Sequence, residues 1–236
     1  MQLHKLSQTV YYSDCDPKTD RPVLGYLHGE KLSVMIDAGN SARHSADFLA
    51  AVQAQGLPLP DYCVLTHWHW DHTFGMCSLP CPTIAHTECQ KKLLSMSQWK
   101  WTDTAMKQRL QSGEEIPFAD EHIRAEYPDL SEIKVVEATK TFSERLSLDC
   151  GSFSCDCIHL PSAHSDDSIA VHLPKQRIIF IGDCYNDDFY QNHFRDLQKT
   201  TTLYRLLQEL PFDTAIPGHS RPLSKEQLLH FLKQFV

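Results

Sequence analysis

Four side chains that bind metals well lie within six residues, in the segment Thr66-His-Trp-His-Trp-Asp-His72. They are His67, His69, Asp71 and His72. Neutral imidazole is the commonest protein ligand for borderline metals, and zinc accepts both His nitrogen and Asp oxygen at about 2.0–2.2 Å. His67 and His69 are two residues apart, so in an extended segment they point to the same side and can reach one ion. Asp71 and His72 suit a second ion if the chain turns there, because four ligands on one ion would leave no open position for catalysis.

Three later residues are candidates to complete a metal centre. His164 lies in a polar loop between two predicted strands, where functional residues tend to concentrate. Asp183 follows the hydrophobic run 178–181, and a buried acid at the end of a strand is costly unless it is paired or bound to a metal. His219 ends the short run Ala215-Ile-Pro-Gly218. Each residue taken singly has an ordinary explanation, as a solvated loop histidine or a helix cap.

The elements that must position these residues form two blocks of strands with helices between and after them. The strands of the first block are predicted at 23–27, 32–36, 62–65 and 83–86, and those of the second at 134–137, 145–148, 153–158, 168–173 and 177–181. Helices are predicted at 41–55, 88–111 and 194–210, with a last one starting at Ser224, whose pairing with Gln227 fits a capping box. A polar segment is expected from 112 to about 131. This α+β pattern indicates two sheets with helices outside.

The chain resembles the metallo-β-lactamase-fold superfamily from about Pro22 to Arg221. His67-Trp-His-Trp-Asp-His72 matches the His-x-His-x-Asp-His motif of that family in full. The later matches, in the family's order, are His164, Gly182-Asp183 and Pro217-Gly-His219, and Asp37 with Gly39 matches an early Asp-x-Gly that is usually structural. Thr73-Phe-Gly75 departs from the Gly-Gly pair of many thioesterase-like relatives, which counts against a glyoxalase-type enzyme.

The resemblance implies one domain over residues 1–236, a four-layered αββα sandwich with a helical insert at about 88–130 and a dinuclear metal site at one edge. One ion would take His67, His69 and His164. The other would take Asp71, His72 and His219, and Asp183 would bridge the two. Zinc is the first choice for two divalent ions with these ligands, with manganese or iron as alternatives. Cys184 is an alternative ligand, but neighbouring side chains of a strand face opposite ways, which favours Asp183.

Such a centre predicts hydrolysis. Two ions about 3.5–4 Å apart can hold a bridging water, lower its pKa towards 7 and polarise a carbonyl or phosphoryl oxygen. Asp71 is the candidate catalytic residue, as acceptor of the proton that this water loses when it becomes hydroxide. We therefore expect a metal-dependent hydrolase that cleaves an ester, lactone, thioester or amide bond in a small molecule.

Three alternatives stay open. The first is a phosphodiesterase of the same fold. The second is a diiron redox protein, which is less favoured because such relatives usually carry an acid at the position of His69 and a flavin domain for which this chain has no room. The third is a non-catalytic metal-binding protein, although degenerate members typically lose ligands and this chain has the full set.

The composition of the chain limits its possible partners and location. The chain has 236 residues, 42% of them hydrophobic, and a formal charge of −8, which argues against a nucleic-acid binder and would repel polyanions. The first ten residues lack a signal-peptide core, no run of about 18 apolar residues exists to span a membrane, and nine cysteines make an odd count. We expect a cytoplasmic protein with reduced thiols and no membrane association, and we leave homodimer formation open.

Several aromatic residues are candidates to shape a substrate pocket. Trp99 and Trp101 in the insert either line a pocket for an apolar acyl or ring group or, the favoured alternative, pack in the core or against a second copy. Trp68 and Trp70 alternate with the ligands and are expected to pack behind the site. Three residues that follow Asp183 are candidates to orient a substrate oxygen: Tyr185, Asn186 and Tyr190.

Overall fold

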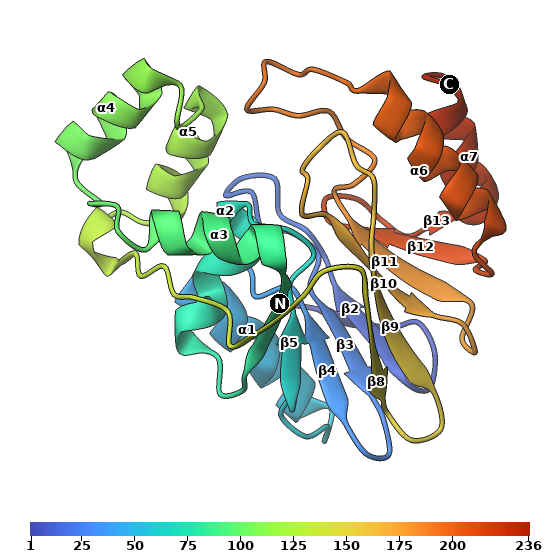
Figure 1. Cartoon of the computed structure of the whole chain (residues 1–236). Helices are drawn as coiled ribbons and strands as arrows, with labels where there is room; N and C mark the ends of the chain where they lie inside the picture. The colour runs from blue at the N-terminus through green and yellow to red at the C-terminus, as the bar shows by residue number, and fades with distance from the viewer.

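Two β-sheets packed face to face, with helices on both outer faces, make up the computed structural model, which describes residues 1–236 (Figure 1). The first sheet has the order β1-β2-β3-β4-β5-β6-β7, with strands Leu3–Lys5, Val10–Ser13, Gly25–His28, Ser33–Ile36, Tyr62–Val64, Thr83–His86 and Lys140–Phe142. The second sheet has the order β13-β12-β11-β10-β9-β8. Its strands, given from β8 to β13, are Arg145–Asp149, Ser154–His159, Ile169–Leu173, Ile178–Gly182, Thr214–Pro217 and Leu223–Ser224. The predicted αββα sandwich is confirmed.

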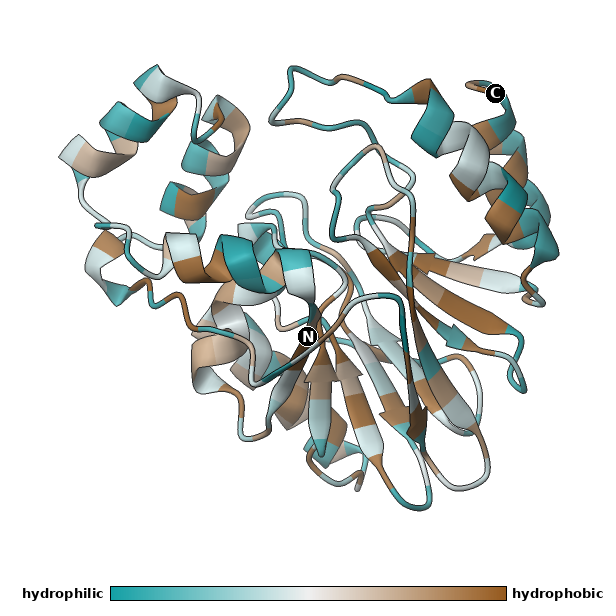
Figure 2. Ribbon diagram, viewed as in Figure 1, coloured by the Kyte–Doolittle hydropathy of each residue, from teal (hydrophilic) through white to brown (hydrophobic).

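Alternation along the strands decides which side chains lie between the sheets. In β10, Ile169 and Val171 belong to the core between the sheets, whereas Ala170 faces the helices that cover the second sheet. In β11, Phe180 points inward and Ile179 points to the helices. These strands are buried on both faces, which explains their nearly unbroken hydrophobic sequence. Figure 2 shows this concentration of hydrophobic residues on the strands.

Helices on the two outer faces have well-defined starts. The first sheet is covered by α1 (Ala42–Ala54) and α3 (Thr87–Met96), and the second by α6 (Leu197–Glu209) and α7 (Lys225–Lys233). Ser41 caps α1 by accepting a 3.0 Å hydrogen bond from the His44 backbone. The predicted capping box of Ser224 and Gln227 is confirmed at the start of α7. No helix combines the length and the apolar character needed to cross a membrane.

The helical insert differs from the prediction in two ways. The single helix predicted at 88–111 is wrong: α3 ends at Met96, and α4 (Asp103–Ser112) begins after Thr102, whose side chain accepts a hydrogen bond from Ala105 N. The segment for which only a polar character was expected contains α5 (Pro117–Glu126), because Pro at the first helical position favours a helix start. The short helix α2 (Trp70–Thr73) and the 3-10 turns Phe74–Ser78 and Leu130–Glu132 complete this half of the chain.

The strand predicted at 134–137 is also wrong. That segment is irregular, and the backbone N–H of Ala138 just beyond it donates to Gln90 Oε1 of α3 rather than to a neighbouring strand. The chain joins the sheet only at β7, which pairs in parallel with β6. In Figure 1 the insert carrying α4 and α5 (green) and the loop before α6 (orange) rise from the same edge of the sandwich.

Candidate metal centre

All seven predicted ligands lie together at one edge of the sandwich, where several strands end. The segment after β5 carries His67 and His69, and α2 carries Asp71 and His72. The other three come from later connections: His164 from the β9–β10 loop, Asp183 from the end of β11 and His219 from the segment after β12. All but His219, which is partly buried, are buried.

A first group consists of His67, His69 and His164, whose ligand nitrogens lie within 4.8 Å of one another. The Nε2 atoms of His67 and His164 are 3.2 Å apart. Burial lowers the pKa of all three imidazoles, so they are neutral and can offer lone pairs.

A second group consists of Asp71, His72 and His219. The Asp71 Oδ2 atom lies 3.0 Å from His72 Nε2 and 3.0 Å from His219 Nε2. Although burial acts in the opposite direction, these two imidazoles hold the pKa of Asp71 well below its usual value. For His72, burial acts to lower the pKa, but the carboxylates of Asp71 and Asp37 outweigh burial, and the pKa is raised. This group therefore attracts positive charge.

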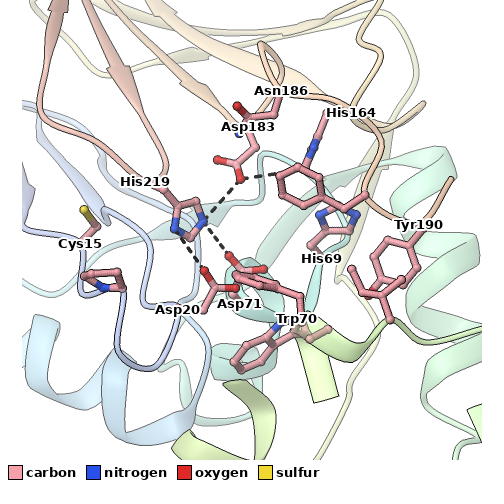
Figure 3. Close-up of a pocket in the computed structure, with 15 residues that line it drawn as sticks. Cys15, Asp20, His69, Trp70, Asp71, His164, Asp183, Asn186, Tyr190 and His219 are labelled. Carbon is pink, nitrogen blue, oxygen red and sulfur yellow. Dashed lines mark hydrogen bonds and ion pairs between the residues drawn. The ribbon is translucent and has the colours of Figure 1, made fainter. Parts of the chain in front are cut away.

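The Asp183 carboxylate lies between the two groups. Its oxygens are 3.9 Å from His164 Nε2, 3.9 Å from His72 Nε2 and 3.4 Å from His219 Nε2. Figure 3 shows Asp183 and Asp71 both pointing toward His219. The neighbouring Gly218 leaves the necessary room, because a Cβ atom there would stand 2.2 Å from Asp183 Oδ1.

Hydrogen bonds from the Nδ1 atoms orient three of the histidines. His72 Nδ1 donates to Asp37 Oδ2 over 2.8 Å, and His164 Nδ1 donates to the Asp187 carbonyl over 2.8 Å. His67 Nδ1 lies 3.1 Å from Thr66 Oγ1, which itself donates to Asp37 Oδ2 over 2.9 Å. Asp37 thus fixes two histidines at once, and each ring presents its Nε2 atom to the common space.

This arrangement fits divalent metal ions. With Nδ1 committed to donation, Nε2 of His67 and Nε2 of His164 carry lone pairs that face each other at 3.2 Å, an arrangement that a cation between them would relieve. Asp183 Oδ1 is buried without any hydrogen-bond partner. Three imidazoles in one group, and two imidazoles and a carboxylate in the other, with Asp183 between, are donors that zinc accepts.

Asp20 is a residue of the site that the sequence did not reveal. Its Oδ1 atom lies 3.4 Å from His219 Nδ1, on the side of the ring away from Asp71. Burial and the nearby charge of Asp71 raise the pKa of Asp20 to about 7. It sits in an irregular loop with a left-handed backbone (φ 52°), and no motif or periodicity marks it.

The family model of the metallo-beta-lactamase superfamily matches residues 19–219. The chain belongs to this superfamily. Its members are generally metal-dependent hydrolases, and this metallo-beta-lactamase-fold protein is an enzyme of that class.

Solved structures agree on the fold. A metallo-beta-lactamase from Pontibacter korlensis is 20% identical, with a TM-score of 0.66 over 99% of this chain and 98% of the other. The DIM-1 metallo-beta-lactamase is 17% identical, with a TM-score of 0.68 over 99% and 96%. The sec-alkylsulfatase Pisa1 from Pseudomonas sp. is 15% identical, with a TM-score of 0.70 over 99% of this chain but 40% of its own. Comparison with curated protein sequences gives no significant match.

A cavity of about 340 Å³ opens onto the metal centre of this metallo-beta-lactamase-fold protein. It is lined by Cys15, Pro17, Asp20, His69, Trp70, Asp71, Ile116, Phe118, Ala119, His164, Asp183, Asn186, Phe189, Tyr190 and His219 (Figure 3). The inner end is formed by the candidate ligands and Asp20, and the outer walls come from α5 and from the loop that follows Asp183.

The alternative ligand Cys184 is not part of the site. Its side chain is buried in the apolar cluster under α6 and α7, together with Ile181 and Leu203. Burial raises the pKa of this thiol, which makes it a poor ligand there.

The four tryptophans considered for the pocket differ in whether they line the cavity. Trp99 and Trp101 are not in the cavity; they pack against the core and hold the Arg109 guanidinium at 4.5 and 4.7 Å from their rings, which agrees with the favoured packing role. Trp68 packs behind His69 as expected, whereas Trp70 is buried but also lines the cavity.

Of the three candidates after Asp183, Asn186 and Tyr190 line the cavity. Tyr185 does not, because its ring packs on Phe231 of α7 at 5.7 Å. The sequence did not single out Ile116, Phe118 and Phe189, which form much of the apolar wall.

Proposed function

We propose that this enzyme holds two divalent ions, with zinc as the first choice, and cleaves an ester, lactone, thioester or amide bond of a small molecule. The observation that carries the proposal is the position of the Asp183 carboxylate between two groups of three ligands. His67, His69 and His164 would hold one ion, and Asp71, His72 and His219 the other, with Asp183 bridging.

Two ions bound there would polarise a carbonyl oxygen and lower the pKa of a water so that it attacks at neutral pH. The chain itself supplies orientation and proton transfer. Asp71 lines the cavity beside Asp183 and His219, so it would accept the proton of the attacking water and return it to the leaving group. Asp20 supports the far nitrogen of His219 and keeps that ring in place.

Metal analysis of the purified protein, followed by hydrolysis assays on ester, lactone, thioester, amide and phosphodiester substrates, tests the proposal. We expect close to two ions per chain, loss of hydrolysis on chelation and recovery when zinc returns. The double variant His67→Ala/His69→Ala should lose metal and turnover together. Full turnover in that variant, or a metal-free enzyme that remains active, would refute the metal-dependent mechanism.

A phosphodiester as the best substrate would support the phosphodiesterase alternative of the same fold. Iron with a visible absorption band and no hydrolysis would support a redox protein. Residence in the cytosol stays a prediction from the sequence, and homodimer formation stays open.

A further inference from the structure

We infer that Tyr190 determines the shape of the substrates that fit at the metal centre, because its ring divides the space beside His69 and His164 into two hollows. A group of the substrate can enter either hollow, but a branched group that would fill both is excluded. This inference rests on the proposed function and assigns to Tyr190 a role in substrate selection at the same site.

The first hollow is the cavity that opens onto the metal centre, and the second is a groove of about 460 Å³. The groove is lined by residues of α3, the β9–β10 loop, the loop after Asp183 and α6, and it is mostly polar, with Asp166 and Lys199 among its lining residues. The cavity and the groove have three lining residues in common: His69, His164 and Tyr190. Both hollows therefore reach the first group of candidate ligands.

Tyr190 is the shared residue that is not a candidate ligand, so its ring is the part of the boundary that no ion would fix. Figure 3 shows Tyr190 beside His69 and His164, on the side away from His219. The Tyr190 ring packs on Trp68 with centroids 5.0 Å apart and on His69 with centroids 5.2 Å apart. The position of this boundary therefore depends on how the protein holds one tyrosine side chain.

The contacts of Tyr190 reach from one hollow to the other. Trp68, on which the ring packs, lines the groove and not the cavity. At the far end of the side chain, the hydroxyl donates its 2.8 Å hydrogen bond to Glu115, which directly precedes Ile116 of the cavity wall. The ring cannot leave the boundary without losing both contacts, so it acts as a fixed wall between the cavity and the groove.

A fixed wall selects substrates by their shape. An ester with one ring on the carbon next to its carbonyl can place that ring in the cavity or in the groove. With two rings on that carbon, one ring would enter each hollow, and the substrate would collide with the Tyr190 ring between them. Because packed side chains yield little space to an added group, the wall disfavours the ester with two rings. Replacing Tyr190 with alanine removes one ring and makes room for another of similar size.

The first test compares methyl phenylacetate with methyl diphenylacetate, two uncharged esters that differ by one phenyl ring, on the metal-loaded enzyme. Because neither ester is charged, the ions and the charged side chains of the site act on both alike. We expect the ratio of kcat/KM for the diphenylacetate to that for the phenylacetate to rise at least about tenfold in Tyr190→Ala. In Tyr190→Phe, which keeps the ring, the ratio should change by less than about twofold. A general loss of activity cancels in this ratio. Phe194→Ala is the matched control from the same loop, since Phe194 is 55% exposed and lines neither hollow.

The second test measures the binding of phenylacetamide and diphenylacetamide by ligand-observed NMR, and it applies whether or not the esters are turned over. We expect Tyr190→Ala to raise the affinity for diphenylacetamide relative to phenylacetamide at least about tenfold. Tyr190→Leu removes the ring but keeps an apolar side chain beside His69. It should shift the preference in the same direction and replaces Tyr190→Ala if that variant does not fold.

An unchanged preference in folded Tyr190→Ala or Tyr190→Leu would overturn the inference, as would an equal shift in Tyr190→Phe. Metal-dependent hydrolysis alongside such a result would still uphold the proposed function. Hydrolysis that survives chelation would instead refute the proposed function.

Discussion

The Tyr190 hydroxyl donates a 2.8 Å hydrogen bond to Glu115 Oε1 and so joins the two walls of the cavity. Tyr190 belongs to the loop after Asp183, and Glu115 to the turn between α4 and α5. The Tyr190 ring also packs on His69, with centroids 5.2 Å apart. Since His69 makes no side-chain hydrogen bond, contact with rings such as Tyr190 and Trp68 is what holds it in place.

Tyr190→Phe should destabilise the protein. It removes one of the two donors to Oε1 of the Glu115 carboxylate, which is buried and whose pKa burial raises; the other donor, Ile116 N, remains. A hydrogen bond to a charged group contributes about 1.5–3 kcal/mol. Urea unfolding of the metal-free protein measures the loss. Tyr204→Phe is the control, because the Tyr204 hydroxyl contacts only Gln208 at an exposed position. An equal effect of the two substitutions would show that the Tyr190 bond contributes nothing specific.

Asp37→Asn should weaken metal binding although Asp37 is not itself a candidate ligand. The carboxylate accepts from Thr66 N over 2.7 Å and from His72 Nδ1 over 2.8 Å, and an amide cannot accept at both positions. Loss of such a supporting group typically lowers metal affinity by about 10–100-fold. Competition with a chelating dye measures the affinity, with Asp14→Asn as a surface control. Unchanged affinity in a folded Asp37→Asn variant would contradict the orienting role.

Gly218→Ala should displace Asp183. The added Cβ would lie 2.2 Å from Asp183 Oδ1 and 3.0 Å from His72 Cε1, so the carboxylate must move from its place between the two ligand groups. We expect loss of at least one bound ion and of activity, measured by metal analysis and turnover. Gly56→Ala, at a site with open space but a φ of +74°, should cost about 1 kcal/mol of stability and keep both ions. Full metal content in Gly218→Ala would argue against a bridging Asp183.

Stability should fall as the pH is lowered from about 6.5 toward 3, in part because of His44. Burial lowers the pKa of this imidazole from 6.5 to about 3, so in that window the unfolded chain takes up a proton that the folded protein does not. The slope from one such group is at most about 1.4 kcal/mol per pH unit. His44 Nδ1 accepts a hydrogen bond from Asn40 N, which an Asn side-chain oxygen can replace. His44→Asn should therefore flatten the dependence of unfolding free energy on pH, and identical slopes would contradict this explanation.

Local sequence patterns predicted the strands around the site and the strand ends at which candidate ligands lie. The nearly unbroken hydrophobic runs in 168–173 and 177–181 reflect burial on both faces of β10 and β11, a property that neighbouring residues encode directly. The insert was predicted less well, because its helices are short and their limits depend on single residues such as Thr102, Gly113 and Pro117. Residues 134–137 are irregular because the chain there contacts α3, and no local sequence pattern predicts such a contact.

The sequence by itself marked the first four candidate ligands, because metal chemistry admits few side chains and these four stand within six residues; the later three candidates were joined to them by the order of the superfamily's motifs. No local pattern groups these residues, and the grouping expected from the resemblance becomes visible in the fold, which brings His67 to His164 across 97 positions and Asp71 to His219 across 148. The same holds for the cavity wall. Asp20, Phe118 and Phe189 carry no local signal of function, and they face one space only because two sheets, an insert and a loop pack around a common edge.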